Sequence, residues 1–199
     1  MSTTIDIYPL SDHLPLVEQT RARTQQLFQE LLDRHDVPSV IEVRAFHPNT
    51  DPVEEIALGT RWAPGLEVGF AYWLNGVWDS SSWPTCESLS GDEEYGNELK
   101  QRLNPEQVAK LNSARHCWFE YRSLGSSAIA STGYGLAAIA LAEAVDGRLV
   151  SWDCAYEDAM HDGDTAAEFL NYWGEYRLSA YGTSAFLKNR RDTAQDHVD

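Results

Sequence analysis

Three potential metal ligands fall within four residues in the C-terminal part of the chain. His161, Asp162 and Asp164 flank Gly163, and carboxylate oxygens are ligands that calcium and magnesium prefer. The ligand spacing of an EF-hand loop is absent. Asp164 also directly precedes Thr165, a predicted helix start, where an acid is favoured for local reasons. We therefore expect a structural, solvated loop without a bound metal, and we expect no other cofactor.

Pairs of carboxylates could act as a general acid and base. Asp79 and Asp153 both fall in aromatic-rich predicted strands, where burial would raise the pKa of a carboxyl group. A pair chosen by residue type has little weight in a chain with 31 acidic residues. A small carboxylate- or metal-dependent hydrolase is therefore the alternative function, and its candidate groups are Asp79, Asp153, Asp162, Asp164 and His161.

Signatures of nucleophilic catalysis and phosphate binding are weak. Cys86, Cys117 and Cys154 are widely spaced and form no Cys-x-x-Cys pair, so buried free thiols are expected in place of disulfides or zinc. His116 neighbours Cys117 in a predicted strand, which turns the two side chains to opposite faces. The glycines of residues 131–135 lack the Gly-Lys-Ser element of a phosphate loop and favour close helix packing. We expect no catalytic residue among these groups.

Acidic charge and tryptophan are concentrated in the same two stretches. The chain has 31 acidic residues against 15 basic ones, and residues 62–99 and 149–176 hold fourteen of the acids but no lysine or arginine. They also hold six of the seven tryptophans. This mixture suits binding of a basic protein. It disfavours nucleic acid and anionic membranes as partners.

The predicted partner-binding surface centres on two acidic loops, residues 83–95 and 156–164. Trp83, Tyr95 and Tyr156 are the expected anchors, because interface centres favour large aromatic residues. The carboxylates expected to face lysine or arginine on the partner are Asp79, Glu87, Asp92, Glu93, Glu94, Glu157, Asp158 and Asp162. Most of the remaining tryptophans are expected in the core.

The clearest local structural signal is Asn75-Gly76, which predicts a two-residue type I′ hairpin. Its register pairs Trp73 with Trp78 and places both on one face of the sheet. Residues Phe70, Tyr72, Leu74 and Val77 form the other face, which is the expected core face. The tryptophan face is either covered or exposed, and a covered face is the commoner outcome.

Periodicity predicts the other elements. Helices are expected over 14–35, after the Ser90-x-x-Glu93 capping spacing, after Asn104-Pro105, over 128–145 and after Thr165-x-x-Glu168. Strands are expected over 40–46, 115–123 and 148–155. The alternation over 115–123 predicts an apolar side with Cys117, Phe119 and Tyr121 and a polar side with His116, Glu120 and Arg122. This order predicts one α+β domain over residues 1–187, with a mostly antiparallel sheet, a central hairpin and helices packed on it. Residues 188–199 are expected to form a polar tail.

Location is predicted from two segments. Residues 128–145 are apolar but interrupted by Ser131, Thr132 and Glu143, so a core helix is expected and not a membrane span. Residues 1–7 lack the basic start and apolar block of a secretory signal. The expected location is the cytoplasm, and a homo-oligomer stays open.

The C-terminal part resembles a unit in a known family. Residues 136–153 form a small-residue-rich helix, Asp146-Gly147 and a strand, and residues 166–173 begin a helix after an acidic loop. This unit resembles one in cytoplasmic immunity proteins of bacterial polymorphic toxin systems, which neutralise a toxin by covering it. The resemblance implies a non-enzymatic toxin-binding protein, and it transfers no binding residue. A scaffold domain that dimerises through the hairpin tryptophans is a third possibility.

Overall fold

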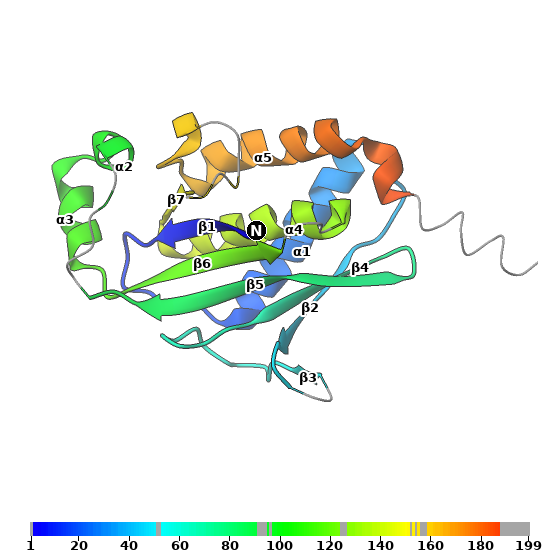
Figure 1. The fold of residues 1–199 in the computed structure, drawn as a ribbon, viewed down its shortest axis with the longest axis horizontal. Coiled ribbons are helices and arrows are strands. Elements are labelled where there is room, and N and C mark those ends of the chain that lie inside the picture. The colour runs from blue at the N-terminus through cyan, green and yellow to red at the C-terminus, as the bar shows by residue number, and fades with distance from the viewer. Residues whose placement is uncertain are drawn as a thin grey trace, which may run out of the picture.

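The chain folds around an antiparallel sheet (Figure 1). The computed structural model describes residues 2–50, 53–90, 95, 97–123, 127–151, 153, 155 and 159–187. Within them, seven strands form one sheet in the order β3-β2-β4-β5-β6-β1-β7, and every pair of neighbours is antiparallel. The predicted α+β class with a mostly antiparallel sheet is confirmed.

The bounds of the elements follow chain order. The strands are β1 (Ser2–Tyr8), β2 (Glu42–His47), β3 (Glu54–Glu55), β4 (Gly69–Leu74), β5 (Val77–Ser88), β6 (His116–Ser123) and β7 (Arg148–Val150). The helices are α1 (Val17–Arg34), α2 (Asn97–Gln101), α3 (Pro105–Ser113), α4 (Ala128–Val145) and α5 (Ala166–Tyr181), with short 3₁₀ turns η1 (Ala159–His161) and η2 (Thr183–Phe186). Residues 188–199, the predicted tail, lie outside the described residues.

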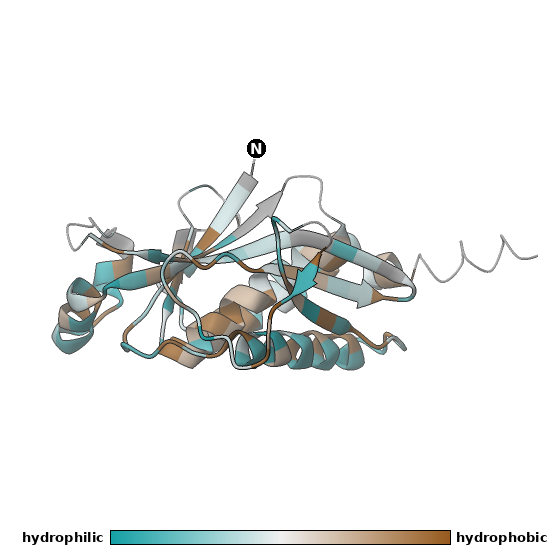
Figure 2. Cartoon of the chain, turned by 90° about the horizontal axis from the view of Figure 1, so that it is seen from below, coloured by the Kyte–Doolittle hydropathy of each residue, from teal (hydrophilic) through white to brown (hydrophobic). Residues whose placement is uncertain are grey.

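Helix α4 is the centre of the core. Every residue from Ile129 to Ala142 is buried, because α4 packs against the sheet and is flanked by α1 and α5. Figure 2 shows these long helices on one side of the sheet. By length and composition α4 could cross a membrane, but 83% of it is buried inside the protein, as expected of a core helix.

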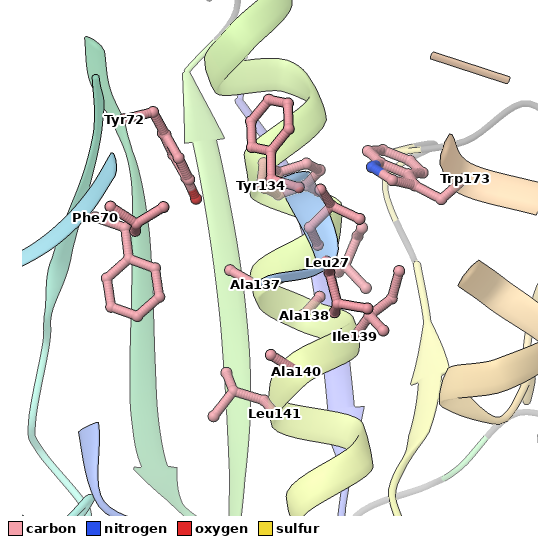
Figure 3. Close-up of a cluster of buried hydrophobic side chains, with 14 of the residues drawn as sticks. Leu27, Phe70, Tyr72, Tyr134, Ala137, Ala138, Ile139, Ala140, Leu141 and Trp173 are labelled. Carbon is pink, nitrogen blue, oxygen red and sulfur yellow. The ribbon is translucent and has the colours of Figure 1, made fainter. Parts of the chain in front are cut away.

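Two glycines let large rings approach α4 closely. A Cβ atom on Gly133 would lie 2.3 Å from the ring of Tyr72, and one on Gly135 would lie 2.0 Å from the ring of Trp173. Figure 3 shows Tyr72 reaching α4 from the sheet and Trp173 reaching it from α5. The prediction of close helix packing is therefore confirmed.

Local sequence chemistry sets the helix ends as predicted. Asn104 accepts a hydrogen bond from the backbone N–H of Gln107 at the start of α3, and Thr165 accepts one from the N–H of Glu168 at the start of α5. In both cases the side chain three residues later accepts a hydrogen bond from the backbone N–H of the cap residue, which completes a capping box. At the C-terminal end of α4, Asp146 adopts a left-handed conformation with φ of 50° and ends the helix.

The hairpin of β4 and β5 also has the predicted register. Trp73 pairs with Trp78, and the turn residues Asn75 and Gly76 have φ of 53° and 94°, as a type I′ turn requires. On the opposite face Tyr72 is fully buried. The predicted core face is confirmed.

Four strands differ from the prediction. Strand β3 was not expected, and β5 continues to Ser88, so residues 83–88 are a strand and not part of the predicted acidic loop over 83–95. Strand β1 was not expected, yet it lies between β6 and β7 and buries Ile5 and Ile7 completely. The strand expected over 148–155 is β7, which ends at Val150. The chain leaves the ladder there because the side chains of Ser151 and Asp153 replace its backbone, as described next.

Side chains cap the edge of β1 beyond β7. Both oxygens of the Asp153 carboxylate lie 2.9 Å from the backbone nitrogen of Thr4, and the Ser151 hydroxyl donates to the carbonyl of Thr4 at 2.9 Å. These groups satisfy the donor and acceptor that a further strand would need. This position of the edge is closed to strand addition.

Helix α1 caps the edge of β2 in a similar way. Gln29 and Gln25 accept hydrogen bonds from the backbone nitrogens of Ile41 and Val43 at 3.1 and 3.0 Å. Arg21 donates to the carbonyl of Val43 at 2.8 Å and to the Gln25 amide at 2.9 Å. Gln25 and Gln29 are one helical turn apart on α1, and they reach Val43 and Ile41, which are two residues apart around the start of β2. The helix therefore supplies the hydrogen-bond partners that a neighbouring strand would supply.

Loss of this side-chain ladder is expected to destabilise the protein and expose the edge. Gln25→Leu with Gln29→Leu should lower the free energy of unfolding by about 2 kcal/mol, at about 1 kcal/mol for each of the two hydrogen bonds lost by the backbone of Ile41 and Val43, and should promote self-association. Urea denaturation and size-exclusion chromatography measure the two effects. Gln26→Leu is the matched control, because the Gln26 amide contacts only Glu30 among the hydrogen bonds found for it. Equal stability of the double variant and the control would contradict the prediction.

Candidate functional site

Among the described residues, no helix lies over β2, β4 and β5 on the side of the sheet opposite α1, α4 and α5 (Figure 2). Paired residues on neighbouring strands point to the same side, so the registers define one continuous surface. We call this surface the open sheet face. Its partly or fully exposed side chains in the described part of the chain are Glu42, Arg44, Glu55, Glu67, Ala71, Trp73, Trp78, Trp83, Thr85 and Glu87. Phe46 faces the same side and is only 8% exposed.

The same side is covered farther along, over β6, β1 and β7. Helices α2 and α3 place Leu99 and Leu111 in a second buried cluster with Cys117 and Val150. The open sheet face is therefore bounded by this cluster at one end and by the β4–β5 turn at the other. Its composition is aromatic and acidic.

The hairpin end of the open sheet face holds two tryptophans in contact. The ring centroids of Trp73 and Trp78 are 5.0 Å apart at an interplanar angle of 46°, and Trp78 is 37% exposed. The guanidinium of Arg44 lies 4.6 Å from the Trp78 ring centroid. The exposed outcome for this hairpin face, which the sequence left as the rarer case, is therefore the one found for Trp78.

Two of the predicted partner-binding residues lie on the open sheet face. Trp83 is partly buried and Glu87 is exposed, and they follow each other on the same side of β5. Asp79 pairs with Tyr72, so Asp79 lies on the helix-covered side. The structure thus separates Asp79 from the surface that it was predicted to join.

The prediction that Tyr95 is an exposed anchor is wrong. Its ring packs edge-on against Tyr8 with centroids 5.1 Å apart, its hydroxyl donates to the carbonyl of Leu111 at 3.3 Å, and the residue is only 7% exposed. Asp162 also has a structural contact, because its carboxylate accepts a hydrogen bond from the backbone of Ser151 at 3.0 Å. The other predicted binding residues, Asp92, Glu93, Glu94, Tyr156, Glu157 and Asp158, lie outside the described residues.

The acids near His161 are held by an arginine that lies just beyond the first acidic stretch. Arg102 approaches the carboxylates of Asp164 at 2.5 Å and Glu168 at 3.4 Å. The buried Asp164 also bonds the Nδ1 atom of His161 at 2.9 Å. These contacts agree with the predicted structural loop. Within the described ranges no group of three or more His, Cys, Asp or Glu side chains is placed to hold a metal ion.

The carboxylates proposed for a hydrolase do not all converge. Asp153 and Asp162 both accept hydrogen bonds from Ser151, whereas Asp79 lies apart from them. Asp79 lies on β5 and Asp153 follows β7, with β6 and β1 between these strands. Three strand spacings of about 4.8 Å separate them by roughly 14 Å. Asp153 is also occupied by Thr4 at the sheet edge. The predicted pair is therefore not brought together.

The thiols have the buried positions expected of structural cysteines. Cys86 and Cys117 are fully buried, and burial raises the pKa of the Cys86 thiol to about 12. A thiol in this environment is protonated and unreactive at neutral pH. Cys154 lies outside the described residues.

A buried acid that the sequence pattern had placed on the polar side of its strand lies in the core. Glu120 of β6 is fully buried on the helix-covered side. The Ser82 hydroxyl donates to its Oε1 atom, and Tyr72 lies 3.2 Å from the Ser82 hydroxyl. Its Oε2 atom has no hydrogen-bond partner in the described part of the chain. Desolvation raises the pKa of Glu120 well above its ordinary value.

The reason for this misplacement is that β6 is covered on both sides. Trp118 and Glu120 face α4, whereas Cys117 faces the second cluster. Strict alternation of apolar and polar residues predicts the buried side only when one face of a strand is wet. The sequence did contain one sign of this, because the large apolar Trp118 lies on the side of the strand that was predicted to be polar.

The observations define a class of protein, an α+β protein with an aromatic and acidic open sheet face. Comparison of the chain with protein-family models, curated proteins and solved structures gave no match. Interpretation of its function therefore depends on the chemistry of the open sheet face.

Proposed function

We propose that this chain is a non-enzymatic binding protein that covers a basic surface of a protein partner with its open sheet face. Its proposed role is that of a cytoplasmic immunity protein that blocks a toxic enzyme, as the resemblance of the C-terminal part implies. The observation that carries the proposal is a sheet surface left without a helix, where three tryptophans, Trp73, Trp78 and Trp83, lie among carboxylates. Tryptophans of this kind dominate binding energy at interface centres.

Charge favours a basic partner. In the part of the open sheet face that is described, Glu42, Glu55, Glu67 and Glu87 contribute carboxylates, and Arg44 is the single cation. Complementary charge raises the association rate and disfavours acidic competitors. A net charge of −16 extends the same attraction beyond the contact surface.

The sheet edges favour face-on docking over strand addition. The backbone groups of Ile41, Val43 and Thr4 are occupied by side chains of α1 or of the segment after β7. A partner strand would have to displace these hydrogen bonds before it could pair. The open sheet face needs no such displacement.

The arrangement of acids supports binding over hydrolysis. Asp164 is buried and bonded to Arg102 and His161, and Asp153 serves the edge of β1. Neither group is paired with a second described carboxylate in a pocket. The hydrolase remains the alternative function, with a bound divalent ion as its supporting result.

The proposal is tested with the protein encoded next to this gene, expected to be a large modular protein with a C-terminal toxic domain. The domain should bind wild-type protein tightly. Trp83→Leu should weaken binding about 30-fold, as expected for loss of about 2 kcal/mol at an interface centre. Glu87→Lys should slow association about tenfold at low salt. Calorimetry and stopped-flow fluorescence measure the two effects.

Glu106→Lys is the matched control, because Glu106 lies on α3 and is 79% exposed. It should leave binding unchanged. Circular dichroism and thermal unfolding confirm that each variant is folded. Equal binding by all variants, purification from the native operon without a partner, or a symmetric homodimer that buries the hairpin tryptophans would each contradict the proposal.

A further inference from the structure

One cation already lies on the aromatic end of the open sheet face. Arg44 belongs to β2, and its guanidinium lies over Trp78 of β5. Its Nε atom is 2.7 Å from Glu42, and its Nη1 atom is 3.6 Å from Glu55. An indole ring and two carboxylates thus surround one guanidinium, which is the set of groups that recognises arginine in interfaces.

We infer that this end of the open sheet face is a receptor for an arginine side chain of the partner, and that Arg44 fills it in the free protein. The inference rests on the proposed function and specifies its contact chemistry. The receptor consists of Trp73, Trp78, Glu42 and Glu55. Arg44 acts as an internal stand-in that the partner's arginine displaces.

The exposure of these groups makes displacement inexpensive. The side chains of Arg44, Glu42 and Glu55 are 50%, 45% and 70% exposed. Ion pairs at such positions contribute little to stability, because water screens them. Arg44 therefore leaves the ring at little cost, whereas an arginine enclosed by an interface gains a desolvated cation–π contact, which is stronger than an exposed one.

The sequence explains why the stand-in comes from another strand. Residues 62–99 supply both Trp73 and Trp78 and contain no lysine or arginine. Strand β2 contributes Arg44 through the register that pairs Glu42 with Trp73. Trp73 contacts Trp78, with ring centroids 5.0 Å apart. Trp78 is 37% exposed even with Arg44 in place, so an incoming arginine can reach its ring.

The shape of the receptor favours arginine over lysine. A guanidinium is planar, stacks on an indole and presents several N–H donors to carboxylates, whereas an ammonium is a compact and strongly hydrated charge. Glu42 and Glu55 lie on either side of the guanidinium's donor set. Arginine on the partner should therefore be preferred.

The receptor is tested by nuclear magnetic resonance with acetyl-tetraarginine amide and acetyl-tetralysine amide as probes, at low ionic strength. The indole N–H signals of Trp73 and Trp78 are followed. The signal that disappears in Trp78→Phe is assigned to Trp78. Arg44→Gln should bind the arginine peptide about fivefold more tightly than wild type, since about 1 kcal/mol of internal competition is removed. It should also prefer arginine to lysine by at least about threefold.

Controls separate the receptor from general charge attraction. Glu42→Gln in the Arg44→Gln background should lose most of the gain, and Glu106→Gln on α3 should keep it. Equal affinity of Arg44→Gln for the two peptides, or unchanged signals of Trp73 and Trp78, would overturn the inference.

The partner assay distinguishes failure of the receptor from failure of the proposed function. If Trp83→Leu weakens binding of the toxic domain but Trp78→Phe and Glu42→Gln do not, the function stands and the receptor fails. If wild type binds no basic protein, the function fails, and the peptide experiment still decides whether the receptor exists.

Discussion

Replacement of Gly135 by alanine is expected to lower the free energy of unfolding by about 3 kcal/mol. Alanine favours a helix over glycine by about 1 kcal/mol, so propensity alone predicts the opposite sign. The new Cβ atom would lie 2.0 Å from Cε2 and 2.2 Å from Nε1 of Trp173. Overpacking of this kind costs 1–3 kcal/mol or somewhat more, in order of magnitude.

The ring of Trp173 cannot move away cheaply. Its Nε1 atom donates to the carbonyl of Thr132 at 3.0 Å, Phe169 stacks on it at 5.4 Å, and the guanidinium of Arg177 lies 4.1 Å from its centroid. These three neighbours therefore hold the Trp173 ring in the space that the methyl group of the new alanine would occupy. The clash is transmitted to the backbone of α4.

Urea denaturation of Gly135→Ala and Gly174→Ala provides the test. A Cβ atom at Gly174 of α5 meets the end of the Leu31 side chain at 2.8 Å, which a rotamer change relieves. Gly174→Ala should therefore stay within about 1 kcal/mol of wild type. Trp173→Leu is destabilising alone by about 3 kcal/mol, but its combination with Gly135→Ala should cost clearly less than the sum. Equal stability of the two alanine variants would refute this account of the packing.

In the wild type, burial of Glu120 is expected to make the free energy of unfolding fall as the pH rises. Glu120→Gln should not show this fall. The pKa of Glu120 is raised by burial in the folded state above its ordinary value of 4.5. The folded protein therefore holds a proton that the unfolded chain releases. This stabilisation is complete below pH 4.5 and falls by about 1.4 kcal/mol per pH unit above it, until the folded-state pKa is passed.

Glutamine has the shape of the protonated acid and keeps an oxygen for the Ser82 hydroxyl. The variant should match wild type at low pH and exceed it increasingly as the pH rises. The difference in unfolding free energy between the two, measured by urea denaturation at several pH values, isolates this group from other acids. Glu87→Gln, on the exposed side of the same sheet, is the matched control and should leave the free energy of unfolding at neutral pH unchanged. Parallel curves for wild type and Glu120→Gln would contradict a protonated Glu120 in the folded protein.

Features set by neighbouring residues in the chain were predictable. Asn75-Gly76 specified the hairpin register, and Asn104 and Thr165 specified helix starts, because turn geometry and capping need only a few residues. Strand β1 was missed because the alternation around Ile5 is short. Its main partner, β6, lies more than a hundred residues away in the chain. Pairing over such a distance depends on the whole fold.

The binding surface was predictable only in part. Trp83 and Glu87 reach the open sheet face, as their acidic and aromatic setting suggested. Tyr95 has the same composition around it, yet it is buried because β1 brings Tyr8 against it. The exposure of Trp78 depends on the absence of a helix over that side of the hairpin, a tertiary property that periodicity does not contain.

The hairpin turn also contacts the end of the described fold. The Asn75 side-chain amide donates to the carbonyl of Phe186 at 2.7 Å, and Phe186 packs edge-on against Phe28 of α1. Helices α4 and α5 contact η2 as well, so η2 docks on several elements that are far apart in the chain. We therefore expect η2 to be the last turn to acquire protection from hydrogen exchange during refolding and the first to lose it in mild denaturant. A residue that the left-handed turn requires thus also holds the last described turn of the fold in place.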